Sequence, residues 1–483
     1  MNILLVQPNN KSTIGLSNVS LIEPTGLEAI AGGLLMDEHR VQIIDLRAIN
    51  YDPDKYLYDA IEEFKPDAIG FSCSFTPDVY RTIELVKRVK NEYGVRYVFV
   101  GGHHVSVYPV DFNIKEIDAV IVGEGENTAR ELINSFLSGT SLSKVNGIIY
   151  NENGHQIKTP ARGMLKNIND LPFFARHLTK EYRKKYFLGI RTSIACLETA
   201  RGCPFKCSFC SVWNFYGGSY RSKSPERVVA ELKEIKEDYV FVVDDNFFSD
   251  VRRVKKIGEL LKKERIHKLY TIQARSDTIV KHPEIISQWK ELGLSNIFIG
   301  FESVDDSKLN SINKNNSSSN NEKAYYIAKK YNIAVTASFI VSPDFTKLDF
   351  KKLIDFVTRL KISVPAFSVL TPLPGTKLYE ELKEKLTIKN YTYYDLFHPV
   401  MKTFLPKNDF FKEFSNLYKI SYKSLNLRTG DILFVMKYIL SGKMSLNHMF
   451  KLKKVMKCIS TPKTYIDSLS ETYVNSLVME SKT

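Results

Sequence analysis

Cysteine is scarce in this sequence. Six of the 483 residues are cysteines, which is too few for a disulfide framework in a chain of this length. Four of the six lie between Cys196 and Cys210, whereas Cys73 and Cys458 stand alone. This distribution predicts a reducing compartment and one local cysteine site.

Long apolar runs are also absent. The most hydrophobic stretch, residues 432–440, contains Lys437 and falls short of the roughly 20 residues that a membrane-spanning helix needs. The apolar run at the amino terminus lacks a preceding basic flank and soon meets Pro8, so we do not expect it to be a signal peptide. We therefore expect a cytoplasmic protein, and attachment to a membrane surface stays open.

Positive charge is in excess. The 68 Lys and Arg residues outnumber the 54 Asp and Glu residues and give a net charge of +14. Residues 401–483 carry +8 of this charge, from 13 Lys and one Arg against three Asp and three Glu. Residues 433–456 interleave lysines with Phe, Met, Leu and Val, as an interfacial helix would. A helical cap with one solvated basic face is the alternative interpretation.

The first 140 residues alternate short apolar runs with helical patterns. Expected strands cover residues 3–6, 41–45, 68–72, 97–100 and 119–122, with helices over 26–36, 54–64, 78–93 and from 127. Apolar strands separated by amphipathic helices are typical of a parallel sheet covered on both faces. The sequence therefore predicts an α/β protein whose residues 1–140 form a doubly wound (Rossmann-like) domain. A linker over residues 141–190 follows, which is expected to hold a small β-rich piece and a polar connection.

A second βα series follows the linker. Its expected strands cover residues 194–199, 239–243, 270–273, 297–301, 334–341 and 366–371, with helices over 225–236, 254–264, 283–292, 321–331 and 350–359. Six such units predict a partial (β/α)6 barrel over residues 191–385. Strand patterns then fade, and residues 386–483 are expected to form a basic helical region.

The most specific motif is CxxxCxxC, formed by Cys203, Cys207 and Cys210 directly after the first strand of the second series. Thiolates this close in sequence can bind one metal centre, but zinc would need a fourth Cys or His ligand. A second CxxC pair is missing, and the next histidine is His267. A four-iron cluster held by three cysteines leaves one iron open to a small molecule, so the spacing favours an iron–sulfur site over structural zinc.

Polar and glycine-rich loops follow several strands of the first series. Ligands of open α/β sheets bind beyond the carboxyl ends of the strands, where these loops meet. A single such loop is equally well explained by tight turns, whereas several on one edge favour a bound ligand. The candidate binding residues are Ser72, Ser74, Thr76, Gly101, Gly102, His103, Gly123, Glu124, Gly125 and Glu126.

These motifs resemble those of a known enzyme family. The block TARGCPFKCSFCSVWNFYGGSYRSKSPERV is similar to the cysteine loop of radical S-adenosylmethionine enzymes, and GGHHVSVYP and VGEGE resemble the cobalamin-binding domain of their class B methyltransferases. With EPTGLEAIAGGLL, VFVVDDNFF, IQARSD, FIGFES and TPLPGT, the similarity extends from Glu23 to Thr376 and is greatest to hopanoid C-3 methylases.

The resemblance implies an oxygen-sensitive enzyme with three cofactors: a [4Fe–4S] cluster on the three cysteines, S-adenosylmethionine on the open iron, and cobalamin. The expected reaction is methylation of an unactivated sp3 carbon of a hopanoid-like or other terpenoid lipid through a 5′-deoxyadenosyl radical and methylcobalamin. A flavodoxin- or ferredoxin-type electron donor is expected, and no nucleic acid partner. Polar side chains at the barrel strand ends can bind the ammonium, carboxylate or ribose of S-adenosylmethionine, and with Phe209 of the cysteine loop the candidates are Phe209, Asp244, Asp245, Gln273, Arg275 and Glu302. An ion-pair network at the barrel mouth, and a core position for Phe209, are the alternatives.

One departure from the family pattern stands out. The cobalamin signature DxHxxG, which supplies an axial histidine, is absent, because the first strand runs into Gln7 and Pro8. A domain that has lost cobalamin is therefore an alternative. Two other functions stay open: carbon–carbon bond or ring formation on membrane lipids, as in the related tetraether ring synthases, and nucleic-acid modification or binding, suggested by the charge alone.

Overall fold

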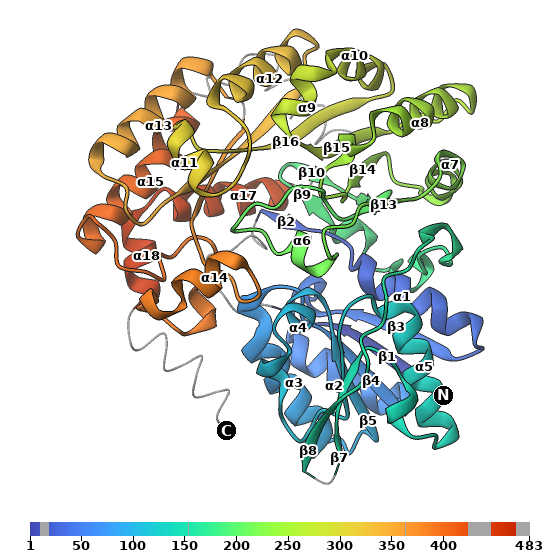
Figure 1. Ribbon diagram of the computed structural model, residues 1–483. Coiled ribbons are helices and arrows are strands. Elements are labelled where there is room, and N and C mark those ends of the chain that lie inside the picture. Colours follow the sequence, from blue (N-terminus) through green and yellow to red (C-terminus); the bar gives the residue numbers. More distant parts are fainter. Residues whose placement is uncertain (10–18, 153, 363, 424–445, 470–483) are drawn as a thin grey trace.

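The computed structural model describes residues 1–9, 19–152, 154–362, 364–423 and 446–469. Two large sheets dominate these residues, one of seven strands and one of six. The sheets belong to an amino-terminal and a central domain that lie one above the other in Figure 1, with the carboxyl-terminal helices along one side of the central domain.

The amino-terminal sheet has the strand order β3-β1-β4-β5-β6-β7-β8. Its parallel strands are β1 (Asn2–Gln7), β3 (Arg40–Asp45), β4 (Ala68–Ser72), β5 (Tyr97–Gly101) and β6 (Ala119–Ile121). One face packs against α1 (Thr25–Met36) and α5 (Gly125–Ser138), the other against α2 (Pro53–Phe64) and α3 (Val79–Asn91). The predicted doubly wound fold is confirmed.

Two details of this sheet go beyond the expectation. The antiparallel hairpin of β7 (Ile148–Glu152) and β8 (His155–Lys158) lies where a small β-rich piece was expected, and it extends the sheet beyond β6. Helix α5 begins at Gly125, two residues before its expected start, because the extended backbone of Glu124 (φ −69°, ψ 123°) caps it.

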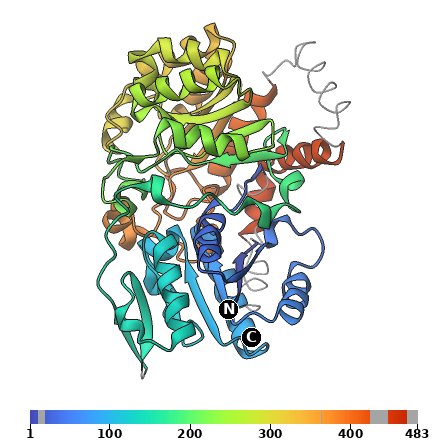
Figure 2. The same ribbon diagram turned by 90° about the vertical axis from the view of Figure 1, so that its right-hand side faces the viewer.

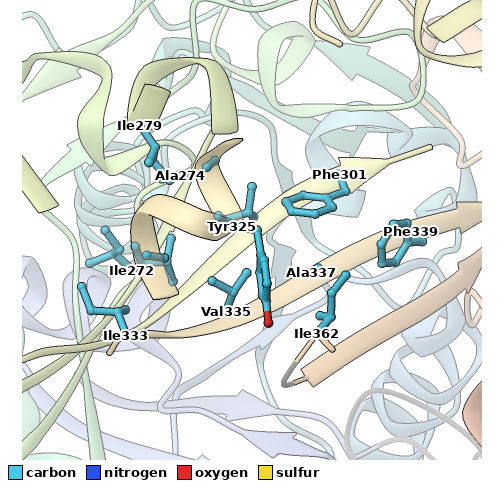
Figure 3. Packing of buried hydrophobic residues seen from close by; sticks show 14 of the residues in the cluster. Ile272, Ala274, Ile279, Phe301, Tyr325, Ile333, Val335, Ala337, Phe339 and Ile362 are labelled. Atoms are coloured by element: carbon cyan, nitrogen blue, oxygen red, sulfur yellow. The ribbon is translucent and has the colours of Figure 1, made fainter. Parts of the chain in front are cut away.

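The central sheet is a partial barrel of six parallel strands, as predicted. They are β11 (Ile194–Leu197), β14 (Tyr239–Val242), β15 (Leu269–Ala274), β16 (Leu294–Glu302), β17 (Ala334–Val341) and β18 (Val364–Val369). Helices α7 (Pro225–Glu234), α8 (Val251–Lys263), α9 (Ser276–Lys281), α10 (Pro283–Glu291), α12 (Ser318–Lys330) and α13 (Lys347–Leu360) connect them. Figure 3 shows Phe301, Val335 and Phe339 in the shared core.

The first barrel strand is shorter than expected and is held at its open edge. It ends at Leu197 because the backbone N–H of Thr199 donates to the Asp244 carboxylate at 2.6 Å instead of to a neighbouring strand. On its outer edge, the Cys196 N–H donates to Glu23, and Arg176 donates to the Cys196 carbonyl at 2.5 Å. These side chains cover an edge that would otherwise expose unpaired backbone groups.

The carboxyl-terminal region contains α15 (Lys407–Lys423), α17 (Leu446–Ile459) and α18 (Pro462–Ser468), which pack beside the barrel (Figure 2). A buried network anchors α18, in which His398 bonds Asp395 and Ser468, each at 2.8 Å. Part of the basic stretch expected over residues 433–456 lies outside the described residues, which resume at Leu446. No described helix has the length and apolar character required to cross a membrane.

Candidate functional site

The three motif cysteines lie on one loop at the carboxyl end of the first barrel strand. Strands β12 (Ala200–Arg201) and β13 (Arg221–Ser222) pair antiparallel and close the base of this loop. Gly202 has φ +86°, and a Cβ there would lie 2.1 Å from the Ser219 carbonyl oxygen. Only glycine fits this close backbone contact, which fixes the start of the cysteine loop.

The thiols are close enough to influence one another. Cys207 is buried, Cys203 and Cys210 are half-buried, and the charges of Cys203 and Cys207 contribute to the raised pKa of Cys210. Burial raises the pKa of all three thiols, that of Cys210 to about 12, so their thiolate forms need a cationic partner such as iron. Within the described part of the chain, no group of three or more Cys, His, Asp or Glu side chains is arranged to hold a single metal ion. A [4Fe–4S] cluster does not need such a group, because each thiolate binds a separate iron.

Two contacts support the cysteine loop, one from its own segment and one from the barrel. The Trp213 indole N–H donates to the Cys207 carbonyl at 3.1 Å. The Arg275 guanidinium lies 3.6 Å from the centre of the Phe205 ring, and it also bonds Asp277 at 2.8 Å. Arg275 is therefore buried and occupied by protein partners, so it orients the cysteine loop, and its expected contact with S-adenosylmethionine stays untested.

The two neighbouring aspartates at the end of β14 have different environments. Asp244 is buried, and it accepts hydrogen bonds from the backbone N–H groups of Thr199 at 2.6 Å and Ala200 at 3.0 Å. Desolvation raises its pKa to about 6. Asp245 is exposed, although surrounding protein atoms and the Asp244 charge raise its pKa to about 6 as well. Of the pair, Asp245 is the one whose carboxylate is accessible to a ligand.

The remaining candidates of the barrel lie around the same loop. Gln273 donates to the Asp244 carbonyl at 3.4 Å. Glu302 is buried and forms an ion pair with Lys314 at 2.7 Å, where its backbone adopts φ +60° beside a register shift in β16. Phe209 is half-buried between Cys207 and Cys210.

The candidate loops of the amino-terminal domain meet at the carboxyl edge of its sheet. Gly102 has φ +118°, and a Cβ there would lie 2.6 Å from the Cys73 carbonyl oxygen. The Cys73 N–H donates to the Gly101 carbonyl at 2.8 Å. In the first of these loops the hydroxyl oxygens of Ser72 and Ser74 are 3.5 Å apart.

Two further loops complete this edge. Thr76 is buried and lies 3.1 Å from His104 Nδ1. The Gly123 N–H donates to Ser106 Oγ at 3.0 Å, and a Cβ at Gly123 would meet no atom within 4 Å. The edge thus combines fixed backbone with open space for a ligand.

The edge of the amino-terminal domain faces the cysteine loop, and arginines join the two. Arg201 Nη1 lies 2.8 Å from Glu124 Oε1, and Arg201 Nη2 lies 2.5 Å from Glu126 Oε1. Arg221 Nη1 lies 2.9 Å from the second oxygen of Glu124. The carboxylates of Glu124 and Glu126, which were expected to bind cobalamin, are therefore paired with arginines across the domain boundary. Gly123 and Gly125 can offer a ligand only their backbone groups.

Comparison with known proteins identifies the family. Residues 197–357 match the radical SAM superfamily, and residues 12–133 match the B12 binding domain. The hopanoid C-3 methylase of Methylococcus capsulatus is 33% identical over 406 residues, which span 83% of this chain and 77% of that protein. This chain belongs to the cobalamin-dependent radical S-adenosylmethionine methyltransferase family.

A second relative and a solved structure extend the comparison. The anaerobic magnesium-protoporphyrin IX monomethyl ester cyclase of Rubrivivax gelatinosus is 27% identical over 420 residues, covering 83% of this chain and 74% of that protein. The solved structure of the radical S-adenosylmethionine methyltransferase TsrM from Kitasatospora setae shares the fold, with a TM-score of 0.71 and 14% identity over 95% of this chain and 98% of that one.

The predicted recognition, fold class and enzyme class of this radical S-adenosylmethionine methyltransferase are confirmed. The two matched domains also confirm the expected cofactors, because one is defined by radical S-adenosylmethionine chemistry on an iron–sulfur cluster and the other by B12 binding. The cysteine donor set and the open edge at Gly123 are compatible with these cofactors. The assignments of individual site residues and the domain boundaries stay predictions.

Sequence reasoning missed the charged residues that frame the loop. Glu198 lies 3.0 Å from Arg201 Nε, which makes Arg201 the centre of three ion pairs with Glu124, Glu126 and Glu198. Two of these partners come from another domain, about 75 residues earlier in the chain, so no local pattern could have revealed them. The only signal was the position of Arg201 beside the motif.

Proposed function

We propose that this methyltransferase methylates an unactivated sp3 carbon of a lipid-like, polycyclic terpenoid substrate. The family membership supports methylation, and the relative named hopanoid C-3 methylase supports the substrate class. The observation that carries the proposal is the direct contact between the two cofactor regions. His103 of the amino-terminal edge lies 2.6 Å from Ser211 of the cysteine loop, so a substrate carbon between the domains would be near both.

In this proposal each part of the chain holds one reactant. Cys203, Cys207 and Cys210 bind the cluster, and the exposed Asp245 is the best placed of the candidate S-adenosylmethionine contacts, with Phe209, Gln273 and Glu302 around it. The loops after β4, β5 and β6 hold cobalamin, with Gly123 leaving room for it. When bound, these cofactors supply a carbon-centred radical and a methyl group. The domain contacts hold both sites in a fixed relative position.

Lipid analysis of a host that expresses the protein tests this function. We expect new lipids heavier by one methylene, and the anaerobically reconstituted enzyme should form 5′-deoxyadenosine and S-adenosylhomocysteine in equal amounts. A variant with all three motif cysteines changed to alanine is the control and should form neither product. Methylation would be contradicted if the wild type made 5′-deoxyadenosine without S-adenosylhomocysteine.

Ring closure is the second candidate, because one relative is named as a cyclase. A ring-forming reaction removes hydrogen without adding carbon, so the product would be lighter by two hydrogens. The same experiment therefore separates the two candidates. The electron donor of flavodoxin or ferredoxin type stays a prediction in either case.

The proposal also includes contact of α17 with an anionic membrane surface. Leu446 and Phe450 are 54% and 61% exposed on this helix, and its outward side also carries exposed lysines without any acidic residue. Exposed aromatic and aliphatic side chains beside lysines are typical of helices that bind anionic lipid. Such a contact would bring the enzyme to a lipid substrate.

Changing Lys453, Lys454 and Lys457 to glutamine is expected to weaken binding to vesicles containing anionic lipid by at least about tenfold, since each lysine near such a surface contributes about 1 kcal/mol. Co-sedimentation measures this binding. The matched control replaces Lys255, Lys256 and Lys262 of α8, which form ion pairs with glutamates, and should bind like the wild type. Equal loss in both variants would indicate a general charge effect and contradict a specific role of α17.

A further inference from the structure

His103 extends from its own domain to the cysteine loop. It begins the short helix α4 (His103–Val107) directly after β5. Its Nε2 lies 2.6 Å from the hydroxyl of Ser211, the residue that follows Cys210. Its ring centre lies 4.8 Å from that of Phe215, in the helix α6 (Val212–Phe215) that continues the loop. Figure 1 shows α4 of the lower domain beneath α6 of the upper one.

The backbone around His103 is held from both domains. Gly102, with φ +118°, packs against the Cys73 carbonyl, and its own carbonyl accepts a bond from the Ser106 N–H at 3.0 Å. From the barrel side, Gly375 lies so close that a Cβ on it would be 2.5 Å from Val107 Cβ. Helix α4 therefore presents His103 in one orientation.

The next histidine has different partners. His104 bonds Thr76 at 3.1 Å and Asp111 at 3.0 Å, both within the amino-terminal domain. His103 has no carboxylate partner among the described residues, and burial together with the neighbouring His104 lowers its pKa to about 4. A neutral imidazole offers one donor and one acceptor, and the Nε2 side is already engaged by Ser211.

We infer that His103 is a positioning residue, which fixes the cysteine loop relative to the cobalamin edge through Ser211. The structure directs its Nε2 at the other domain. The hydrogen bond sets the location of Ser211 and, through the chain, that of Cys210. This inference rests on the proposed binding of both cofactors.

Two variants separate the roles. His103→Leu removes the hydrogen bond, whereas His103→Gln places an amide nitrogen close to the position of Nε2 and retains it. We expect His103→Leu to change the electron paramagnetic resonance spectrum of the reduced cluster with S-adenosylmethionine and to raise the ratio of 5′-deoxyadenosine to methylated product about tenfold. His103→Gln should restore both. Ser211→Ala should change the cluster spectrum and the product ratio as His103→Leu does. The double variant, His103→Leu with Ser211→Ala, should show no larger change than either single variant.

The spectrum of cob(II)alamin separates this positioning role from a role as a cobalt ligand. It should be identical in the wild type and His103→Leu, and the control His155→Leu, on the exposed hairpin strand β8, should alter neither spectrum. Nitrogen coupling to cobalt that disappears in His103→Leu would overturn the inference, as would additive effects of His103→Leu and Ser211→Ala. A wild type that binds no cobalamin would instead refute the proposed function, and the cluster spectrum would still decide the role of Ser211.

Discussion

The Cys207→Ala variant is expected to lose its iron and all detectable cleavage of S-adenosylmethionine, and the same is expected for Cys203→Ala and Cys210→Ala. The three thiols are the donor set of the loop, and the loop base is fixed by the Gly202 contact with Ser219. With one thiol gone, two protein ligands remain for a cluster that already has one open iron. Iron content, visible absorbance and 5′-deoxyadenosine formation measure the effect under strictly anaerobic conditions.

Cys196→Ala is the matched control. Cys196 lies on β11, close to the loop, and its side chain is completely buried. Burial raises the pKa of its thiol to about 12, and its backbone is bonded to Glu23 and Arg176. This variant should retain full iron content, with only the small loss of stability that follows removal of a buried sulfur. Retained iron in Cys207→Ala would contradict the assignment of the cluster ligands.

The cysteine site could be predicted from the sequence because its residues form a local pattern. Cys203, Cys207 and Cys210 lie within eight residues on one loop, so their proximity follows from chain geometry alone. Asp244 and Arg275 were expected at strand ends, and they follow the ends of β14 and β15. Their contacts could not be predicted, because the partners Thr199 and Phe205 belong to other segments and only the folded barrel brings them together.

The fold was predicted where periodicity is strong. The six barrel strands are apolar runs separated by amphipathic helices, and each appears within a few residues of its expected position. Within residues 141–190 a small β-rich piece and a polar linker were expected, because Gly147 and Gly154 are typical of turns. The hairpin of β7 and β8 is that piece. Its pairing with β6 depends on a sheet edge that becomes available only in the tertiary structure.

The second large effect concerns the domain boundary. Arg201→Met is expected to destabilise the docked arrangement of the two domains by about 3–5 kcal/mol, since it leaves buried carboxylates without their cation. The Arg201 side chain is only 6% exposed. After its removal, Glu124 is still compensated by Arg221 at 2.9 Å. Among the described residues, however, Glu126 has no other ion-pair partner.

Tryptophan fluorescence can follow this change at the site itself. The chain has two tryptophans: Trp213 beside the cysteine loop, and Trp289 in the barrel core. In a Trp289→Phe background, urea unfolding followed by fluorescence reports the loop. Arg201→Met should lower the unfolding midpoint strongly, whereas the control Arg359→Met, which breaks an exposed pair with Glu322, should shift it little.

Glu126→Gln tests whether the unpaired carboxylate is the cause. Neutralising Glu126 removes the charge that Arg201→Met leaves uncompensated, so the double variant should be more stable than the sum of the two single changes predicts, by about 1–3 kcal/mol. Arg201→Lys should fall between the wild type and Arg201→Met, because a lysine keeps the charge but cannot bond two carboxylates with a planar fork. Strictly additive effects would show that Arg201 stabilises the boundary by packing alone. In that case shape complementarity, and not ion pairing, would hold the two cofactor domains together.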